Sequence, residues 1–351
     1  MPTDLSARDV AADVTASGRR ARGRRTTVVT AALAGLAFCL FVVTMMAGSF
    51  AVSAWEVIAS TFHLRADPAV DFIVRDLRLP VATAALAVGA ALGIAGMLFQ
   101  KLLANPLASP DFVGISSGAS LFAVSALVLL DASSTTISGA ALVGALVSAA
   151  LIYALAWRDG VTGYRFILIG IGITQLMLSL IGYIVARADL YEARQAMTWL
   201  VGTVGQAGRG ELRTLLVALV VLLPAALLLE RPLRTLELGD DAAKALGTRV
   251  ELSRLALIAV SIVLVGLATA VAGPIMFVAL VAGPIARRLT DSSSGGLVAA
   301  AFVGAIVVLG ADLVSHHLLP ADLPTGVVTG IIGAPYLIWL LITVNREGRG
   351  G

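Results

Sequence analysis

The sequence predicts an all-α, polytopic membrane protein with about ten transmembrane helices. Hydrophobic residues make up 58% of the 351 residues and charged residues only 13%, whereas a soluble domain carries roughly 25% charged residues. Apolar runs long enough to cross a bilayer recur along the whole chain, with polar residues mostly in the segments between them. This pattern excludes a soluble globular protein. The single cysteine, Cys39, excludes a disulfide within the chain.

Residues 1–25 are polar and end in a cluster of arginines. We expect them to form a disordered basic tail on the cytoplasmic side of the membrane. The apolar run that follows is too long for the core of a typical signal peptide and has no clear cleavage pattern. It is therefore interpreted as a retained first helix, with a cleaved signal peptide as the alternative. Nucleic acid is not an expected partner, because the bilayer already accounts for the arginines.

Residues 26–346 are expected to form one membrane domain of ten helices. The apolar runs are Val28 to Ala47, Val81 to Phe99, Phe112 to Leu130, Ile137 to Trp157, Phe166 to Ala186, Leu212 to Leu229, Leu255 to Val271, Ile275 to Ala286, Leu297 to Val314, and Gly326 to Val344. The eighth run is short and joins the seventh at Gly273-Pro274. An even number of crossings places both termini on the same side of the membrane.

The basic residues predict the orientation of these helices. Most of the 25 Lys and Arg residues fall in the N-terminal tail and in the segments that would share its side of the membrane. Because cytoplasmic loops carry an excess of Lys and Arg, this asymmetry predicts that both termini are cytoplasmic. The prediction does not depend on any one short loop, since the tail and residues 231–254 supply much of the excess.

Residues 75–121 contain the most informative stretch. Arg75 and Arg78 precede the second apolar run, and Lys101 follows it, so they mark opposite faces of the membrane. Asn105-Pro106 then ends the helix, because proline has no N–H group and disfavours the helical region for the residue before it. A new apolar run starts soon afterwards.

Glycines at helical spacing predict close packing between helices. They form two side-chain-free strips at which another helix can approach, Gly89, Gly93 and Gly96 in the second run and Gly326, Gly330 and Gly333 in the last. The second run is therefore expected to be a packed helix rather than a lone anchor.

The loop at residues 231–254 is the largest polar segment on the predicted cytoplasmic side. Its sequence predicts a short amphipathic helix that begins at an Asp240 N-cap, carries an Asp240–Lys244 pair and closes at Gly247 in the left-handed conformation. The apolar side chains expected on its surface are Leu236, Leu238, Ala243 and Leu246. The alternative is a helix folded back on its own bundle.

No catalytic motif is visible. The lysines, Lys101 and Lys244, do not follow the glycine pattern of a phosphate-binding loop. Asp312 lies one helical turn before His316, but one carboxylate beside a His pair is a weak metal or catalytic pattern. We expect a structural hydrogen bond or ion pair for Asp312, and no metal or cofactor on this chain. If ATP drives the protein, a separate polypeptide hydrolyses it.

Several motifs in one order carry a family resemblance. They are Arg-Leu-Pro at 78–80, the glycine-rich run ending in Gln100, Asn-Pro-Leu-Ala at 105–108, Gly-Ile-Ser-Ser-Gly-Ala at 114–119 and the closing DLPTGVVTGIIGAPYLIWLL. Roughly from Phe72 to Leu341, the chain resembles the permease subunits of bacterial ABC importers for ferric siderophores, haem and cobalamin, the FecCD family of type II importers.

The resemblance implies a multi-pass permease of the bacterial cytoplasmic membrane. Its implied partners are a second permease subunit in a homodimer or heterodimer, two ATP-binding subunits, an extracytoplasmic substrate-binding protein, a ferric siderophore and membrane lipid. ATP would bind the partner subunits.

It also implies three sets of functional residues. Docking of the binding protein would involve Arg75, Arg78 and His316. The cytoplasmic gate and translocation path would involve Gln100, Asn105, Pro106, Leu107, Gly163 and Tyr164. Coupling to the ATP-binding subunit would involve Leu238, Gly239, Asp240, Asp241, Ala243, Leu246 and Gly247.

The chain departs from the family pattern at both faces. Val81 and His316 replace arginines of the outer face, while Gly163 and Tyr164 replace small hydroxyl residues at the gate. These departures favour one half of an asymmetric permease pair.

Cobalamin and haem remain alternative substrates. An ion-coupled secondary transporter, the alternative from another class, would need acidic residues within its spans, and Asp312 is the main candidate.

Overall fold

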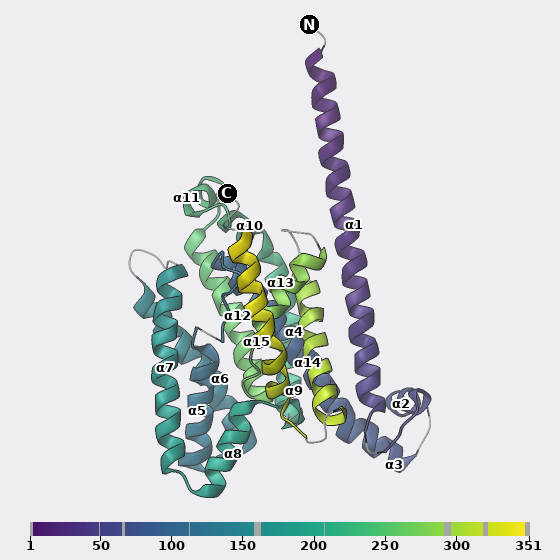
Figure 1. Cartoon of the computed structure of the whole chain (residues 1–351), viewed down its shortest axis with the longest axis vertical. Helices are drawn as coiled ribbons and strands as arrows, with labels where there is room; N and C mark the ends of the chain where they lie inside the picture. The colour runs from purple at the N-terminus through teal and green to yellow at the C-terminus, as the bar shows by residue number, and fades with distance from the viewer. Residues whose placement is uncertain are drawn as a thin grey trace.

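The computed structural model describes residues 3–48, 50–64, 67–111, 113–157, 163–206, 208–290, 296–318 and 322–347, with side chains described from Gly23 to Thr343. These residues form a helical bundle without strands (Figure 1). Its ten main helices are α1 (Thr3–Met46), α4 (Leu79–Leu102), α5 (Ile115–Leu130), α6 (Ser134–Ala156), α7 (Gly163–Arg187), α9 (Arg209–Leu228), α12 (Val250–Ala272), α13 (Val278–Thr290), α14 (Leu297–His317) and α15 (Thr325–Glu347).

Each apolar run predicted from the sequence corresponds to one of these main helices. Within the described residues, eight helical segments are long and apolar enough to cross a membrane. The other two main helices are shorter, with 16 residues in α5 and 13 in α13. The predicted disordered tail is wrong, because α1 already begins at Thr3.

Short helices connect the main ones. They are α2 (Ala54–Thr61), α3 (Pro68–Asp71), the π-helix η1 (Phe72–Arg78), α8 (Leu190–Val201), the 3₁₀ turn η2 (Val204–Gln206), α10 (Glu230–Leu236) and α11 (Asp240–Ala245). Of these, only a helix near α11 was predicted from the sequence.

The core lies around α4, which packs against α14, α12 and α13. The glycine strip of α4 makes this possible. A Cβ atom on Gly89 would overlap the backbone at Gly304, one on Gly93 would overlap Ala300, and one on Gly96 would overlap Ala279. Helix backbones therefore touch at these positions, which confirms the predicted close packing.

The predicted glycine strip of α15 is only partly correct. A Cβ atom on Gly326 would overlap the carbonyl oxygen of Val201 at the end of α8, and one on Gly333 would overlap Phe277. Gly330 has open space at its Cβ position within the described part of the chain. Two of the three glycines thus form close contacts, and they contact different segments.

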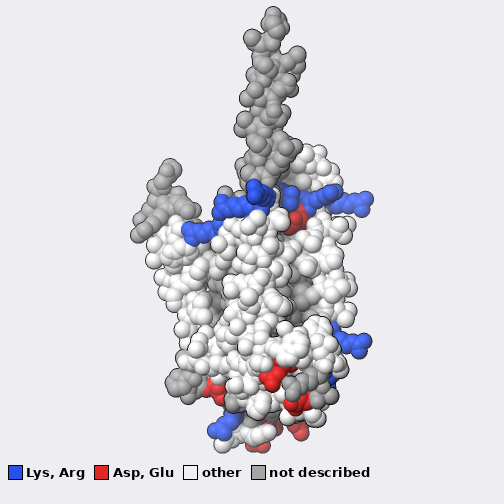
Figure 2. Space-filling model, turned by 90° about the vertical axis from the view of Figure 1, so that its right-hand side faces the viewer, with Lys and Arg blue, Asp and Glu red and all other residues white. Residues whose placement is uncertain are grey.

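The two ends of the bundle differ in charge. Helix α1 begins and α15 ends at the same end, where α10 and α11 also lie (Figure 1). On the side that carries α1, a band of Lys and Arg lies across this end, an uncharged belt follows, and acidic groups gather near the other end together with a few basic ones (Figure 2). We call the two ends the basic end and the opposite end.

Candidate functional sites at the two ends of the bundle

Arg78 lies at the opposite end, where it caps a helix. Its guanidinium donates hydrogen bonds to the carbonyl oxygens of Met45 at 2.9 Å, Met46 at 3.0 Å and Phe50 at 2.5 Å. Helix α1 ends at Met46, so these bonds satisfy carbonyl groups that the helix leaves unpaired. Gly48 permits the approach, because a Cβ atom there would overlap the guanidinium.

Arg75 holds the connection between α2 and η1. Its Nε donates to the carbonyl oxygen of Ser60 at 2.6 Å, and its Nη2 lies 3.6 Å from the Asp71 carboxylate. The Ser60 hydroxyl also donates to Asp71, at 2.6 Å. The three side chains form one polar cluster that fixes α2 against the start of the second span.

Asp312 and His316 form a pair near the end of α14. The Asp312 side chain is buried, its Oδ1 lies 3.3 Å from Nδ1 of His316, and it accepts a hydrogen bond from the Thr325 hydroxyl at 3.3 Å. This confirms the hydrogen-bonding role predicted for Asp312. A hollow of about 400 Å³ is lined by Arg78, Asp312, His316 and His317, among others. Two of the three predicted docking residues therefore meet at one hollow, and Arg75 lies outside it.

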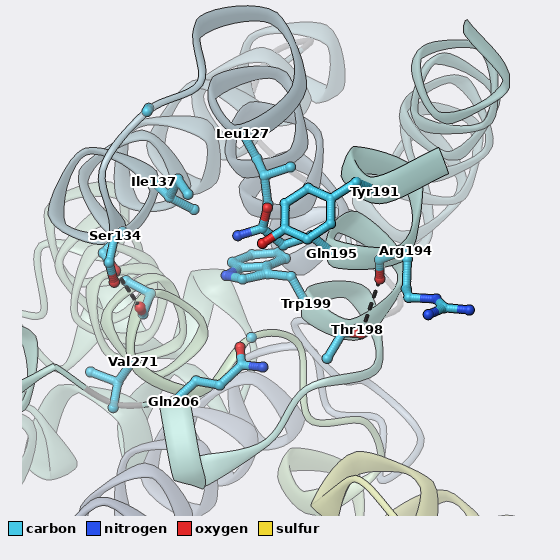
Figure 3. A pocket seen from close by; sticks show the side chains of 14 residues that line it. Leu127, Ser134, Ile137, Tyr191, Arg194, Gln195, Thr198, Trp199, Gln206 and Val271 are labelled. Carbon is cyan, nitrogen blue, oxygen red and sulfur yellow. Dashed lines mark hydrogen bonds between the residues drawn. The ribbon is translucent and has the colours of Figure 1, made fainter. Parts of the chain in front are cut away.

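A second hollow at this end was not predicted from the sequence. It measures about 390 Å³ and lies between α8 and the ends of α5, α6 and α12 (Figure 3). Tyr191, Gln195 and Trp199 of α8 point toward Leu127 and Ile137 across it, whereas the Arg194 guanidinium points away. The hollow combines aromatic rings with amide and hydroxyl groups, a lining suited to a polar ligand with apolar parts.

The sequence does contain a signal for α8. Asp189 and Glu192 form a capping box, in which the Asp189 backbone N–H donates to Glu192 Oε2 at 3.2 Å. Asp followed three residues later by Glu marks a helix start even where no long apolar run follows. This pattern predicts the helix, but not the residues that it faces.

At the basic end, Gln100 is a packing residue. Its side chain is buried, and its Nε2 donates to the Leu280 carbonyl oxygen at 2.8 Å. A Cβ atom on Gly283 would overlap its amide oxygen, so α4 and α13 meet closely here. Gln100 therefore joins two helices at the level of the predicted gate and is not exposed to a path within this chain.

The remaining gate residues lie together just beyond Gln100. The Asn105 side chain accepts a hydrogen bond from the Leu107 backbone N–H at 2.9 Å, which forms the turn that Pro106 continues. A Cβ atom on Gly163, at the start of α7, would lie 3.4 Å from the Leu103 side chain. The two predicted halves of the gate are therefore adjacent. Tyr164 is highly exposed.

Asp111 anchors the loop that leads from this turn into α5. Its carboxylate accepts hydrogen bonds from the Ser116 hydroxyl at 2.6 Å and the Ser109 hydroxyl at 3.3 Å. Burial raises the pKa of the Asp111 carboxyl group, and the two serine hydrogen bonds oppose that shift. The sequence analysis missed this residue, because a single Asp after a proline carries no distinctive pattern.

Helix α11 projects from the basic end (Figure 1). It closes as predicted at Gly247, which has a φ of 81°. The Gly247 N–H donates to the Lys244 carbonyl at 2.9 Å and the Thr248 N–H to the Ala243 carbonyl at 2.9 Å. These paired bonds form a Schellman motif. The predicted N-cap is wrong, because Gly239, with a φ of 97°, occupies that position and Asp240 is the first helical residue.

The ion pairs of the loop also differ from the prediction. Asp240 accepts hydrogen bonds from Nη2 of Arg254 at 2.8 and 3.1 Å, and Lys244 lies 3.8 Å from Asp241 rather than pairing with Asp240. Arg254 also contacts Glu251, its neighbour on α12, at 2.9 Å. The Arg254 bonds tie the start of α11 to the start of α12.

The exposed apolar surface of the loop is smaller than predicted. Leu238 is 65% exposed and Leu246 is 64% exposed, but Ala243 is fully buried beneath the helix. Leu236 is only partly exposed. Two largely exposed leucines therefore flank α11 on the outside of the bundle.

Comparison with known proteins identifies the family of this chain. The FecCD transport family matches residues 35–343, most of the chain. The chain belongs to the FecCD transport family. As a FecCD protein it is a multi-pass permease of the cytoplasmic membrane, from a family whose members serve as the membrane subunits of ABC importers and work with ATPase and binding-protein partners.

Individual relatives agree with this assignment. The FecCD permease is 42% identical to the ferric enterobactin permease FepG of Escherichia coli (strain K12), over 78% of this chain and 84% of the relative. It is 37% identical to the achromobactin permease CbrC of Dickeya dadantii (strain 3937), over 91% and 93%. It is 36% identical to the hemin permease HmuU of Yersinia pestis, over 79% and 84%.

A solved structure has the same fold. This FecCD chain superposes on an inward-facing metal-chelate type ABC transporter with a TM-score of 0.80, covering 90% of this chain and 99% of that one, at 24% sequence identity. The helical bundle around α4 therefore has the same fold as that transporter chain.

Proposed function

We propose that this chain is the permease subunit of an importer that carries a ferric siderophore across the cytoplasmic membrane, driven by ATP that separate subunits bind and hydrolyse. Two of the relatives described above support a siderophore, since one belongs to a ferric enterobactin transport system and another to an achromobactin transport system. The hemin permease, at 36% identity, makes haem the second candidate. In this proposal the chain itself hydrolyses no ATP and holds no cofactor.

The physical argument starts from the substrate. A siderophore complex is large and polar, so it does not pass between lipid tails. The core around α4 is closed by backbone contacts at Gly89, Gly93 and Gly96, which leaves little space within one bundle. Two bundles facing each other would form a central cavity, and alternate closure at its two ends would move the substrate inward.

The coupling step is proposed for the loop that contains α11. Leu238 and Leu246 extend from the basic end and suit contact with an ATP-binding subunit. Arg254 connects this surface to α12, and α10 contacts α4, which leads to the turn at Asn105. Movement of the ATP-binding subunits would thus reach the predicted gate through α10 and α4. At the opposite end, the hollow lined by Arg78 and His316 would receive the binding protein.

Reconstitution tests the proposal. The chain is incorporated into proteoliposomes with its second permease and ATP-binding subunits, and loaded binding protein is added outside. We expect uptake of iron supplied as a siderophore complex to require ATP and the binding protein, and to persist without a proton gradient. Uptake driven by a proton gradient without ATP would overturn the proposal. Uptake of haem but not of ferric siderophore would replace the substrate and leave the ABC mechanism intact.

A further inference from the structure

An open groove lies at the basic end between α1, α14 and the junction of α9 with α10. Its volume is about 470 Å³. Small side chains of α1, Thr30, Ala31 and Ala34, form one wall, and Leu227, Leu297 and Val298 contribute to the others. Helix α1 packs on α14 but leaves this space beside α9.

The groove lies at the end of the bundle where Figure 2 shows a band of basic residues on the α1 side of the molecule, since Arg24 and Arg25 directly precede its α1 lining. Helix α1 is mostly exposed there, with only 22% of its most apolar stretch buried within the chain. Arg24 and Arg25 immediately precede the lining residues of α1, and Arg25 Nε donates to the Leu289 carbonyl oxygen at 3.3 Å. The groove is therefore bordered by a largely exposed face of α1, and two arginines precede its α1 wall, with Arg25 held against the end of α13.

Among the described residues that line this groove, Glu230 is the one acidic residue. Its Oε2 accepts a hydrogen bond from Arg234 at 3.2 Å, and its side chain is only 13% exposed. Its Oε1 is buried and has no hydrogen-bond donor among the described residues. A buried carboxylate oxygen without a donor is costly. Such an oxygen beside an otherwise mainly apolar groove calls for a donor from outside the chain.

We propose that the groove binds a phospholipid with a primary ammonium headgroup. An acyl chain would lie along the small side chains of α1, and the phosphate would lie near Arg24 and Arg25. The Glu230 carboxylate would turn into the groove, so that its Oε1, which is covered in this structure, accepts a hydrogen bond from the ammonium. The charges of the chain complement this lipid, because the Glu230 carboxylate is anionic where the ammonium would lie and the two arginines are cationic where the phosphate would lie. A lipid with an uncharged glycerol headgroup supplies the same chains and phosphate but no ammonium donor for Glu230.

Native mass spectrometry of the detergent-purified permease complex tests the site. The complex is incubated with equal amounts of phosphatidylethanolamine and phosphatidylglycerol of identical acyl chains. We expect preferential retention of phosphatidylethanolamine, about tenfold for one charge-assisted hydrogen bond. The variant Glu230→Gln should lose most of this preference, because an amide oxygen is a weaker acceptor for an ammonium group. The variant Glu237→Gln, on an acid outside the groove, should keep it.

A second variant tests the groove itself. Ala34→Trp fills the space with an indole ring and should reduce retention of both lipids, while the thermal unfolding midpoint confirms that the variant is folded. Equal retention of both lipids by the unaltered complex would overturn the proposal, as would an unchanged preference in Glu230→Gln, unchanged retention in Ala34→Trp, or binding of an inorganic cation only. The measurement requires no transport, so its failure is distinct from failure of the proposed function.

Discussion

Gly304 and Gly310 provide a matched pair on α14. A Cβ atom on Gly304 would overlap the Gly89 backbone, whereas one on Gly310 would have open space within the described residues. We predict that Gly304→Ala destabilises the protein by about 1–3 kcal/mol, because α4 and α14 must separate. Gly310→Ala should be neutral or stabilising by about 0.5–1 kcal/mol, since alanine favours helix more than glycine does. Thermal unfolding in detergent measures both, and equal shifts would contradict the packing argument.

Residue types were easier to predict than residue roles. Arg78 stood out in the sequence because it opens an apolar run, yet its hydrogen bonds go to carbonyl groups at the end of α1, distant in the chain. Asp312 was recognised as a residue that needs a partner, and Thr325 and His316 supply one. A charged side chain in an apolar helix needs a hydrogen-bond or ion-pair partner, and the sequence alone shows this need. Which group satisfies it depends on the neighbouring helices.

Gly247 controls the end of α11. Its φ is 81°, and no atom of the described residues lies within 4 Å of its Cβ position, so a substitution acts through the backbone alone. We predict that Gly247→Val costs about 1–2 kcal/mol locally, because a β-branched residue resists the left-handed conformation. Gly247→Asn should be tolerated, since asparagine adopts that conformation more readily.

The readout for Gly247 is ATP hydrolysis stimulated by loaded binding protein in the reconstituted complex. The valine variant should lower this stimulation several-fold while membrane insertion stays unchanged, and the asparagine variant should remain close to the unaltered protein. Equal stimulation of ATP hydrolysis in the two variants would contradict the prediction, because it would show that coupling does not depend on how α11 ends.

At the scale of elements, long apolar runs were predictable and short connecting helices were not. The ten predicted runs all correspond to helices, because apolar segments in lipid must satisfy their backbone groups internally. Helix α8 and the π-helix η1 lack such a run. Only the Asp189–Glu192 capping box signals α8. The π-helix η1 ends with a hydrogen bond from the Leu79 N–H to the Val74 carbonyl, five residues earlier, and no local sequence pattern predicts this bond.

The whole bundle buries its helices unequally. In the segment Pro68–Leu102, which includes α4, 78% of the most apolar stretch is buried, whereas the corresponding value is 17% for both α7 and α9. Such exposed apolar surfaces face lipid or another subunit. A transport path between two bundles requires part of this surface to face a second permease.

We predict that this second permease is a different chain. Gly163 and Tyr164 at the predicted gate and His316 at the opposite end depart from the family pattern, and a partner carrying the usual residues would complete both faces. An affinity-tagged form of this chain should therefore co-purify with a second FecCD permease in equal amount. A complex that contains two copies of this chain and transports substrate would contradict the prediction.

The sequence by itself determined the class of protein, the number and order of its main helices, the glycine strip of α4 and the closure of α11, because each of these follows from local composition or from a backbone conformation that only certain residues adopt. The tertiary structure alone decided that Arg78 caps α1, that Ala243 is buried while Leu238 and Leu246 are exposed, and that Glu230 borders a groove with one oxygen unpaired. These features depend on which distant helix lies alongside, and periodicity within one helix does not specify its neighbour.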